Sequence, residues 1–194
     1  MASSGGQPPT ANESVGPSAS DGLVKLSHVN EHGTANMVDI TGKQPSERRA
    51  VARCQVTLAP GARGLLAIER EASRIFAEAR AVGIMAAQRT STIIPLCHPI
   101  HVDGLSLDFA VASGVVDVRA VAEAFERTGL EMEALVACAV AALSIVGELR
   151  KFEPRATIGS LTLWEKSGGR SGHWQRSPDV SPPGTVGSGV RPVA

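Results

Sequence analysis

The chain has 194 residues, a formal net charge of zero and 43% hydrophobic residues, which suits one soluble globular domain. Only 3% of the residues are aromatic and tyrosine is absent, so the basic surface and the stacking platforms of a nucleic-acid-binding protein are both missing. No apolar run reaches membrane-spanning length without interruption, and the N-terminus lacks the pattern of a signal peptide. We therefore expect a cytoplasmic protein that contacts neither nucleic acid nor membrane.

The two ends of the chain are rich in Ser, Gly and Pro and poor in large apolar residues. Such segments cannot bury enough surface to offset the entropy that is lost on ordering. We expect a disordered N-terminal tail at 1–22, one folded domain at 23–174 and a disordered C-terminal tail at 175–194.

Within the folded part, the spacing of apolar residues changes between the two-residue period of strands and the longer period of helices. Two alternating segments flank a Ser-Gly pair, which predicts a β-hairpin. Gly83 lies inside the first helical pattern and indicates a bend or a close packing contact there. In chain order, we expect a strand at 51–58, a helix at 64–88, hairpin strands at 105–111 and 116–122, a helix at 132–151 and a strand at 158–163.

This order of elements predicts an α+β fold. The arrangement is a ferredoxin-like split β-α-β sandwich, in which one antiparallel sheet carries two helices on one face. The opposite face of the sheet would be uncovered. Because we expect that face to be apolar, it should be hidden by the N-terminal segment or by another subunit, and we expect an oligomer.

The three cysteines, Cys54, Cys97 and Cys138, lie in apolar surroundings without a paired spacing. This pattern favours reduced thiols over a disulfide framework or a zinc ribbon. Four histidines could gather a metal ion, because they form two pairs that are separated by four and by three residues. No carboxylate or thiol accompanies them at a matching helical spacing, so we expect no metal site. These histidines are His28, His32, His98 and His101.

The segment IPLCHP, at 94–99, places a Cys-His pair between two prolines. Proline neither continues a helix nor donates to a central strand ladder, so a rigid turn is predicted here. A fixed His98 could bind a phosphate or transfer a proton, because its charge changes near neutral pH. It could equally be a hydrogen-bonded histidine that shapes the turn.

Two further groups are candidates for ligand binding. Glu131 and Glu133 precede the second long apolar pattern, where they either cap the helix dipole or serve a polar heterocycle as acid and base. The glycines of KSGGRSG, at 166–172, expose backbone N–H groups beside two cations. This chemistry suits a phosphate, although a solvated loop has the same composition.

Several of these segments, taken together, resemble the molybdenum-cofactor biosynthesis protein C family, the cyclic pyranopterin monophosphate synthases. The match keeps the family's order and spacing from about Leu26 to Trp174, which is far more specific than one short motif. The matching segments are MVDITGK (37–43), GIMAAQRT (83–90), IPLCHP (94–99), GLEMEALVACAVAALSI (129–145) and KSGGRSG (166–172).

The resemblance implies a lyase of molybdenum cofactor biosynthesis, which converts a cyclised dihydro-GTP to cyclic pyranopterin monophosphate and pyrophosphate. It also implies a homohexamer, a trimer of dimers, with active sites between subunits. Neither a cofactor nor a catalytic metal is implied. A radical S-adenosylmethionine GTP cyclase would supply this guanine-nucleotide substrate.

By the same resemblance, the Cys-His turn and the start of the long helix line the substrate pocket, while cations from two other segments hold phosphate oxygens. The expected pocket residues are Leu96, Cys97, His98, Met132 and Glu133, and the expected phosphate-binding residues are Arg48, Lys166 and Arg170. The expected catalytic residues are His98, Glu131, Glu133 and Arg150.

The chain departs from the family pattern at four charged positions. Ala72 and Gln88 stand where the family has lysines, and Gly147 stands where it has an aspartate that is regarded as catalytic. Arg150 replaces another lysine and keeps the charge, but a guanidinium does not release a proton near neutral pH. Three functions therefore stay open. The chain could be a pyranopterin synthase, a related lyase for another nucleotide-derived substrate, or a catalytically impaired paralogue that binds nucleotides or has a regulatory role.

Overall fold

The computed structural model describes residues 28, 32–152, 154–177 and 191–192. It divides the chain into an N-terminal unit, 1–36, and a second unit that contains all of the helices and strands described below. In the first unit, the backbone N–H of Asn36 donates to the carbonyl of His28 at 2.8 Å. The N-terminal tail predicted at 1–22 lies outside the described residues.

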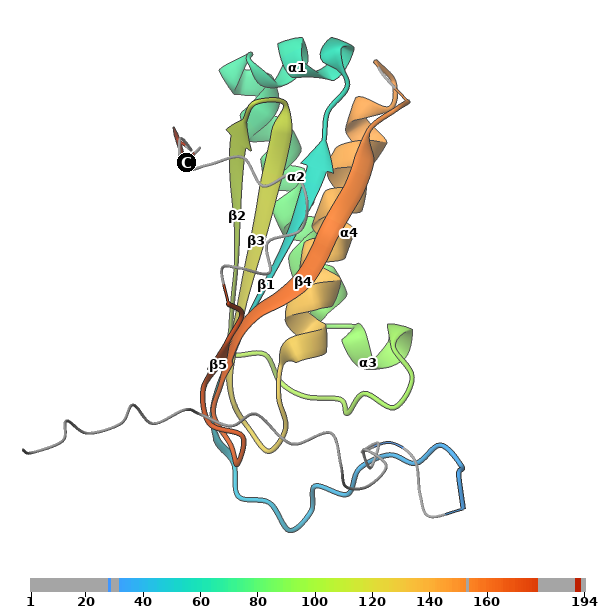
Figure 1. Ribbon diagram of the computed structural model, residues 1–194, viewed down its shortest axis with the longest axis vertical. Coiled ribbons are helices and arrows are strands. Elements are labelled where there is room, and N and C mark those ends of the chain that lie inside the picture. The colour runs from blue at the N-terminus through green and yellow to red at the C-terminus, as the bar shows by residue number, and fades with distance from the viewer. Residues whose placement is uncertain (1–27, 29–31, 153, 178–190, 193–194) are drawn as a thin grey trace, which may run out of the picture. The chain divides into compact units, whose positions relative to one another are not determined.

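The second unit is built around one antiparallel sheet (Figure 1). Its strand order is β5-β4-β1-β3-β2-β6, and every neighbouring pair is antiparallel. The elements are β1 (Ser46–Thr57), α1 (Pro60–Leu66), α2 (Glu69–Ala87), α3 (Thr90–Ile93), β2 (Gly104–Ala112), β3 (Val115–Glu126), α4 (Glu131–Leu149), β4 (Thr157–Ser167), β5 (Trp174–Gln175) and β6 (Arg191–Pro192).

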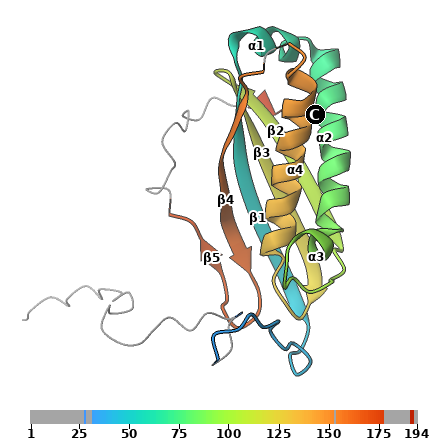
Figure 2. The same cartoon turned by 90° about the vertical axis from the view of Figure 1, so that its right-hand side faces the viewer.

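The four long strands and the two long helices form the predicted ferredoxin-like sandwich. Helix α2 follows β1, helix α4 follows β3, and both helices cover the same face of the sheet (Figure 2). They are antiparallel, since Arg74 near the start of α2 pairs with Glu148 near the end of α4 at 2.9 Å. The α+β fold class is therefore confirmed.

The hairpin between β2 and β3 follows its predicted turn chemistry. Ser113 and Gly114 both have positive φ, at 51° and 81°, as a two-residue primed turn requires. The paired strands are longer than the alternating pattern alone predicted, because polar residues such as Glu123 and Glu126 continue the ladder with β1.

The helix expected at 64–88 is two helices. It begins earlier, at Pro60, which is the first residue of α1 and has the fixed φ that suits a helix start. Ile68 then has an extended backbone, with φ −85° and ψ 107°, and separates α1 from α2. Gly83 marks a close contact in α2, because a Cβ atom there would lie 2.7 Å from Leu107 Cδ1 and 2.9 Å from the Ala137 carbonyl.

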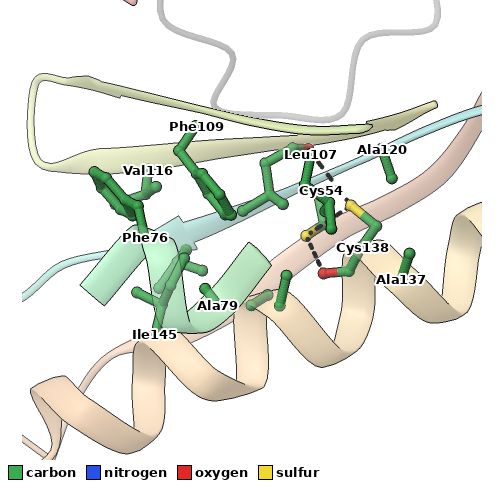
Figure 3. Packing of buried hydrophobic residues seen from close by; sticks show 14 of the residues in the cluster. Cys54, Phe76, Ala79, Leu107, Phe109, Val116, Ala120, Ala137, Cys138 and Ile145 are labelled. Carbon is green, nitrogen blue, oxygen red and sulfur yellow. Dashed lines mark hydrogen bonds between the residues drawn. The ribbon is translucent and has the colours of Figure 1, made fainter. Parts of the chain in front are cut away.

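The core lies between the helices and the sheet (Figure 3). Alternate residues of β1 point into it, and small residues of α4 let the helix lie close to the strands. The rings of Phe76 and Phe109 stack with centroids 4.9 Å apart. Cys54 and Cys138 also meet here, although the sequence shows no paired spacing for them.

The opposite face of the sheet is mixed rather than uniformly apolar, because charged side chains share it with Val51, Val121 and Phe125. Arg49 of β1 pairs across the strands with Glu123 and Glu165, and the Arg53 guanidinium lies 4.7 Å from the ring centroid of Trp164. The expected apolar face is therefore present only in part, since the residues of β1 and β3 that alternate with the core residues include both charged and apolar side chains.

Exposed apolar side chains also lie on the helices. Leu143 of α4 is 58% exposed and Met85 of α2 is 50% exposed. Helix α4 is the one described helix that is long and apolar enough to span a membrane, with a mean hydropathy of 1.9, but half of it is buried against the rest of the protein. A helix that is apolar around its whole circumference is usually buried on all sides, by a core or by an interface with another chain.

Candidate functional site

A pocket of about 730 Å³ opens at the end of the sheet where α4 begins. Three segments form it: the start of β1 with the residues before it, the loop between β3 and α4, and the glycine-rich loop after β4. The lining residues are Gly42, Lys43, Gln44, Ser46, Arg48, Arg49, Arg127, Thr128, Gly129, Leu130, Glu131, Lys166, Ser167, Gly168, Gly169, Arg170 and Ser171.

The pocket is strongly cationic in a chain that carries no net charge. Six of its lining residues are Lys or Arg, and a single one, Glu131, is acidic. Clustered cations beside glycine-rich backbone form the environment that binds phosphate groups. The arrangement therefore suits an anionic ligand that carries more than one phosphate.

Arg48 is fixed at the centre of this wall without a carboxylate partner in the hydrogen bonds described for it. Its Nε donates to the Glu126 carbonyl at 3.1 Å, and its Nη2 lies 3.5 Å from the Arg127 carbonyl. Backbone carbonyls orient the guanidinium but do not neutralise its charge. Gly169 has φ 68°, and a Cβ atom on it would collide with the Arg48 guanidinium, so glycine is required for this contact.

Lys166 and Glu131 join two walls of the pocket. Lys166 Nζ lies 3.1 Å from Glu131 Oε1, and both side chains are half-buried. Because Lys166 is the last residue but one of β4 and Glu131 is the first residue of α4, the pair connects the strand that leads into the glycine-rich loop with the start of the helix. An anion that enters the pocket would compete with Glu131 for the ammonium group.

Glu133 lies on the same helical turn as Glu131 but is 4% exposed. Burial, with a smaller contribution from the negative charge of Glu131, raises its pKa to about 7. The carboxyl of Glu133 in turn adds to the effect of burial in raising the pKa of the Cys97 thiol. A carboxyl that gains and loses a proton near neutral pH is equipped for acid–base chemistry.

The Cys-His turn lies beside this part of the site. The Cys97 N–H approaches the Ile94 carbonyl at 3.4 Å, and Leu96 between them has φ 64°. A bulky residue in that left-handed region is strained, and such strain concentrates at functional sites. His98 is near enough to contribute to the lowered pKa of Asp39, whose main cause is the hydrogen bond from the Thr41 N–H.

Three of the four departed family positions, Ala72, Gly147 and Arg150, lie at the other end of the helix pair, whereas Gln88 follows the last residue of α2 at the end where α4 begins. Gly147 is the seventeenth residue of α4, about 24 Å along the helix axis from Glu131. Arg150 follows the helix and is exposed. Ala72 is buried near the start of α2. The ion pairs at this end include those of Arg74, which bridges Glu71, Glu78 and Glu148.

The structure thus brings together some of the residues predicted from the sequence and separates others. Arg48, Lys166, Arg170 and Glu131 line one pocket. The second group, which is outside that lining but near the start of α4, consists of Leu96, Cys97, His98, Met132 and Glu133. Arg150 is remote from both groups.

Sequence reasoning missed three cations of the pocket as ligand-binding residues: Lys43, Arg49 and Arg127. Lys43 ends the MVDITGK segment, and Arg49 adjoins Arg48, so both had a local signal. Arg127 had none. Within the parts of the chain that the structure describes, no three His, Cys, Asp or Glu side chains are grouped in a way that could hold a metal ion.

Comparison with known proteins agrees with the resemblance. Residues 37–169 match the model of the MoaC family. A cyclic pyranopterin monophosphate synthase of Streptomyces avermitilis is 42% identical over 170 residues, which cover 87% of this chain and 98% of that protein. The synthase of Geobacter sulfurreducens is 42% identical over 156 residues, covering 79% and 98%, and that of Brucella melitensis is 40% identical over 161 residues, covering 81% and 97%.

Proposed function

Because the chain belongs to the MoaC family, we propose that it is a cyclic pyranopterin monophosphate synthase, a phosphorus–oxygen lyase of molybdenum cofactor biosynthesis. Its substrate would be a cyclised dihydro-GTP, and its products cyclic pyranopterin monophosphate and pyrophosphate. The observation that carries this proposal is the cationic pocket, since six Lys and Arg side chains surround a space large enough for a nucleotide-sized ligand.

The pocket suits the departure of pyrophosphate. A hydroxyl of the substrate attacks its α-phosphorus, a new P–O bond forms, and the P–O bond to pyrophosphate breaks. Arg48, Lys166 and Arg170 would hold the oxygens of the leaving group, where negative charge develops. Glu133 or His98 would take the hydroxyl proton, and a Glu133 carboxyl with a pKa of about 7 can hold or release it near neutral pH.

The assembly that we propose is the homohexamer, a trimer of dimers, with sites between subunits. Two features support it. Position 147, where the family has an aspartate, lies about 24 Å along α4 from the pocket end, and position 72, where it has a lysine, is on α2 near the same remote end, so one chain cannot bring both ends to one ligand. Exposed apolar residues on the helices, such as Met85 and Leu143, also leave surface for another subunit to cover.

The remaining expectations follow from the same proposal. The enzyme would work in the cytoplasm, without a metal or cofactor, on a substrate made by a radical S-adenosylmethionine GTP cyclase. Leu96, Cys97 and Met132 would line the ring-binding part of the site next to Glu133.

A second candidate is a nucleotide-binding paralogue that no longer turns over substrate. It is favoured by the α2–α4 end, where Ala72 is buried and Gly147 bears no side chain. An active site that needs a lysine at position 72 and an aspartate at position 147 would lack both charges. Such a protein would keep the anion pocket and lose the reaction.

Binding of inorganic pyrophosphate to the full chain, measured by titration calorimetry, tests the pocket on which both candidates rest. We expect Lys166→Ala and Arg170→Ala each to weaken binding roughly tenfold to a hundredfold, since each removes a charge-assisted contact. The matched control is Arg53→Ala, which removes an arginine from the open face of the sheet. Equal affinity in the pocket variants and the control would contradict the proposed anion site.

A further inference from the structure

Cys54 and Cys138 form a pair that the proposed function does not use. Their sulfur atoms are 3.3 Å apart, although the residues are 84 positions apart in the sequence. Cys54 is in the central strand β1 and Cys138 is in α4, so the two sulfurs meet where the helix packs on the sheet (Figure 3). Neither residue lines the cationic pocket.

Each thiol also lies near a backbone carbonyl, and both are buried. The Cys54 thiol is 3.6 Å from the Cys138 carbonyl, and the Cys138 sulfur is 3.4 Å from the Val118 carbonyl. Cys54 is 1% exposed and Cys138 is 0% exposed. The S–S bond of a disulfide is about 2.05 Å long, so bond formation requires the two sulfurs to move about 1.3 Å closer together.

We propose that Cys54 and Cys138 are a dithiol–disulfide pair, which a soluble low-molecular-weight disulfide oxidises to a bond that fastens α4 to β1. One cysteine thiolate attacks the small disulfide, forms a mixed disulfide and releases one small thiol. The other cysteine thiolate attacks the mixed disulfide, forms the Cys54–Cys138 bond and releases the second small thiol. Two protein thiols are oxidised, one small disulfide is reduced, and the two thiol protons end on the released thiols.

Burial makes this exchange depend on opening of the core. A hydrogen bond with Cys54, together with burial, raises the pKa of the Cys138 thiol, so the reactive thiolate is scarce while the helix is packed on the sheet. The exchange therefore proceeds when α4 separates from β1 or before the core has closed. Once formed, the bond closes a long loop and restricts the unfolded chain.

The test incubates the full chain with oxidised glutathione, with and without a urea concentration below the unfolding transition. Free thiols are then alkylated in denaturant and counted by mass spectrometry, and the bond is located by peptide mapping. We expect the free thiols to fall from the three of the sequence to Cys97 alone, faster with urea. We also expect the oxidised protein to melt about 10 °C higher.

Two variants provide matched controls. Cys97→Ser should still lose both of its thiols to one bond, whereas Cys138→Ala should form no bond within the chain. Peptide mapping of the unmodified protein does not depend on how well either variant folds. Three free thiols after incubation with urea and oxidised glutathione, or a bond that involves Cys97, would overturn the proposal.

Discussion

Glu131 and Glu133 are neighbours on one helical turn, yet the fold gives them different surroundings. Glu131 pairs with Lys166 at the mouth of the pocket. Glu133 is buried, and its pKa is raised to about 7 from an ordinary value of 4.5. In enzymes, two carboxyls in such different surroundings have different pKa values, so that one can act as an acid and the other as a base.

The raised pKa of Glu133 makes stability depend on pH. The folded state holds the Glu133 proton more tightly than the unfolded state does, so its contribution is fully present below pH 4.5 and is lost as the pH rises through about 7. Glutamine has no carboxyl to titrate, so the Glu133→Gln variant should not lose this stability as the pH rises. We expect the variant to match the unmodified protein near pH 4 and to exceed it above pH 7 by up to about 3 kcal/mol.

Urea unfolding at several pH values measures that difference. A gap between Glu133→Gln and the unmodified protein that stays constant from pH 4 to pH 8 would show that Glu133 does not titrate near neutrality in the folded state. Glu131→Gln should shift the same pH dependence toward lower pH, because it removes a negative charge that contributes to the raised pKa of Glu133.

At the scale of elements, the contact between α2 and the rest of the core depends on the absence of a side chain at Gly83. We expect Gly83→Ala to destabilise the protein by about 1–3 kcal/mol despite the better helix propensity of alanine, because its Cβ has no room beside Leu107 and Ala137. Gly147→Ala is the matched control, since nothing lies within 4 Å of a Cβ atom there. It should be neutral or stabilise α4 by up to about 1 kcal/mol.

Denaturant midpoints of the two glycine variants check this prediction. A stabilising Gly83→Ala substitution would mean that α2 and β2 are not in close contact at this point. From the sequence alone, Gly83 indicated either a bend in the helix or a close packing contact. The packing of α2 on α4 and β2 shows that the close contact is the correct alternative.

The elements that the sequence predicted well are those with a strong apolar period. The hairpin, α4 and β4 lie within a few residues of the expected ranges, because each has one face in the core. The start of β1 was missed, since Ser46 to Arg49 are polar and form a strand through pairing with β3 and β4. The break at Ile68 has no glycine or proline to announce it.

The candidate site shows the same limit. The segment KSGGRSG indicated that Lys166 and Arg170 could bind a phosphate. The sequence did not show that they lie beside Arg48, because that proximity depends on the pairing of β1 with β4. Those residues are more than a hundred positions apart, a separation that local patterns do not report. The Cys54–Cys138 contact was missed for the same reason.

At the scale of the whole molecule, two ends carry different chemistry. The end of the sheet at the start of α4 has a cationic pocket and a buried carboxyl, while the other end of α4 has an ion-paired surface around Arg74. In the proposed oligomer the two ends meet across subunits. The account therefore predicts that substitutions in the cationic pocket weaken both ligand binding and turnover.

The most direct measurement incubates the purified full chain with freshly prepared cyclised dihydro-GTP and follows cyclic pyranopterin monophosphate and pyrophosphate. We expect product from the unmodified chain, and a kcat/KM lower by about 10²–10³ in Lys166→Ala, the loss typical of one group that stabilises developing charge. Product formed only when Ala72→Lys and Gly147→Asp are introduced together, with none from the unmodified chain, would contradict the synthase and leave a protein that binds without catalysis.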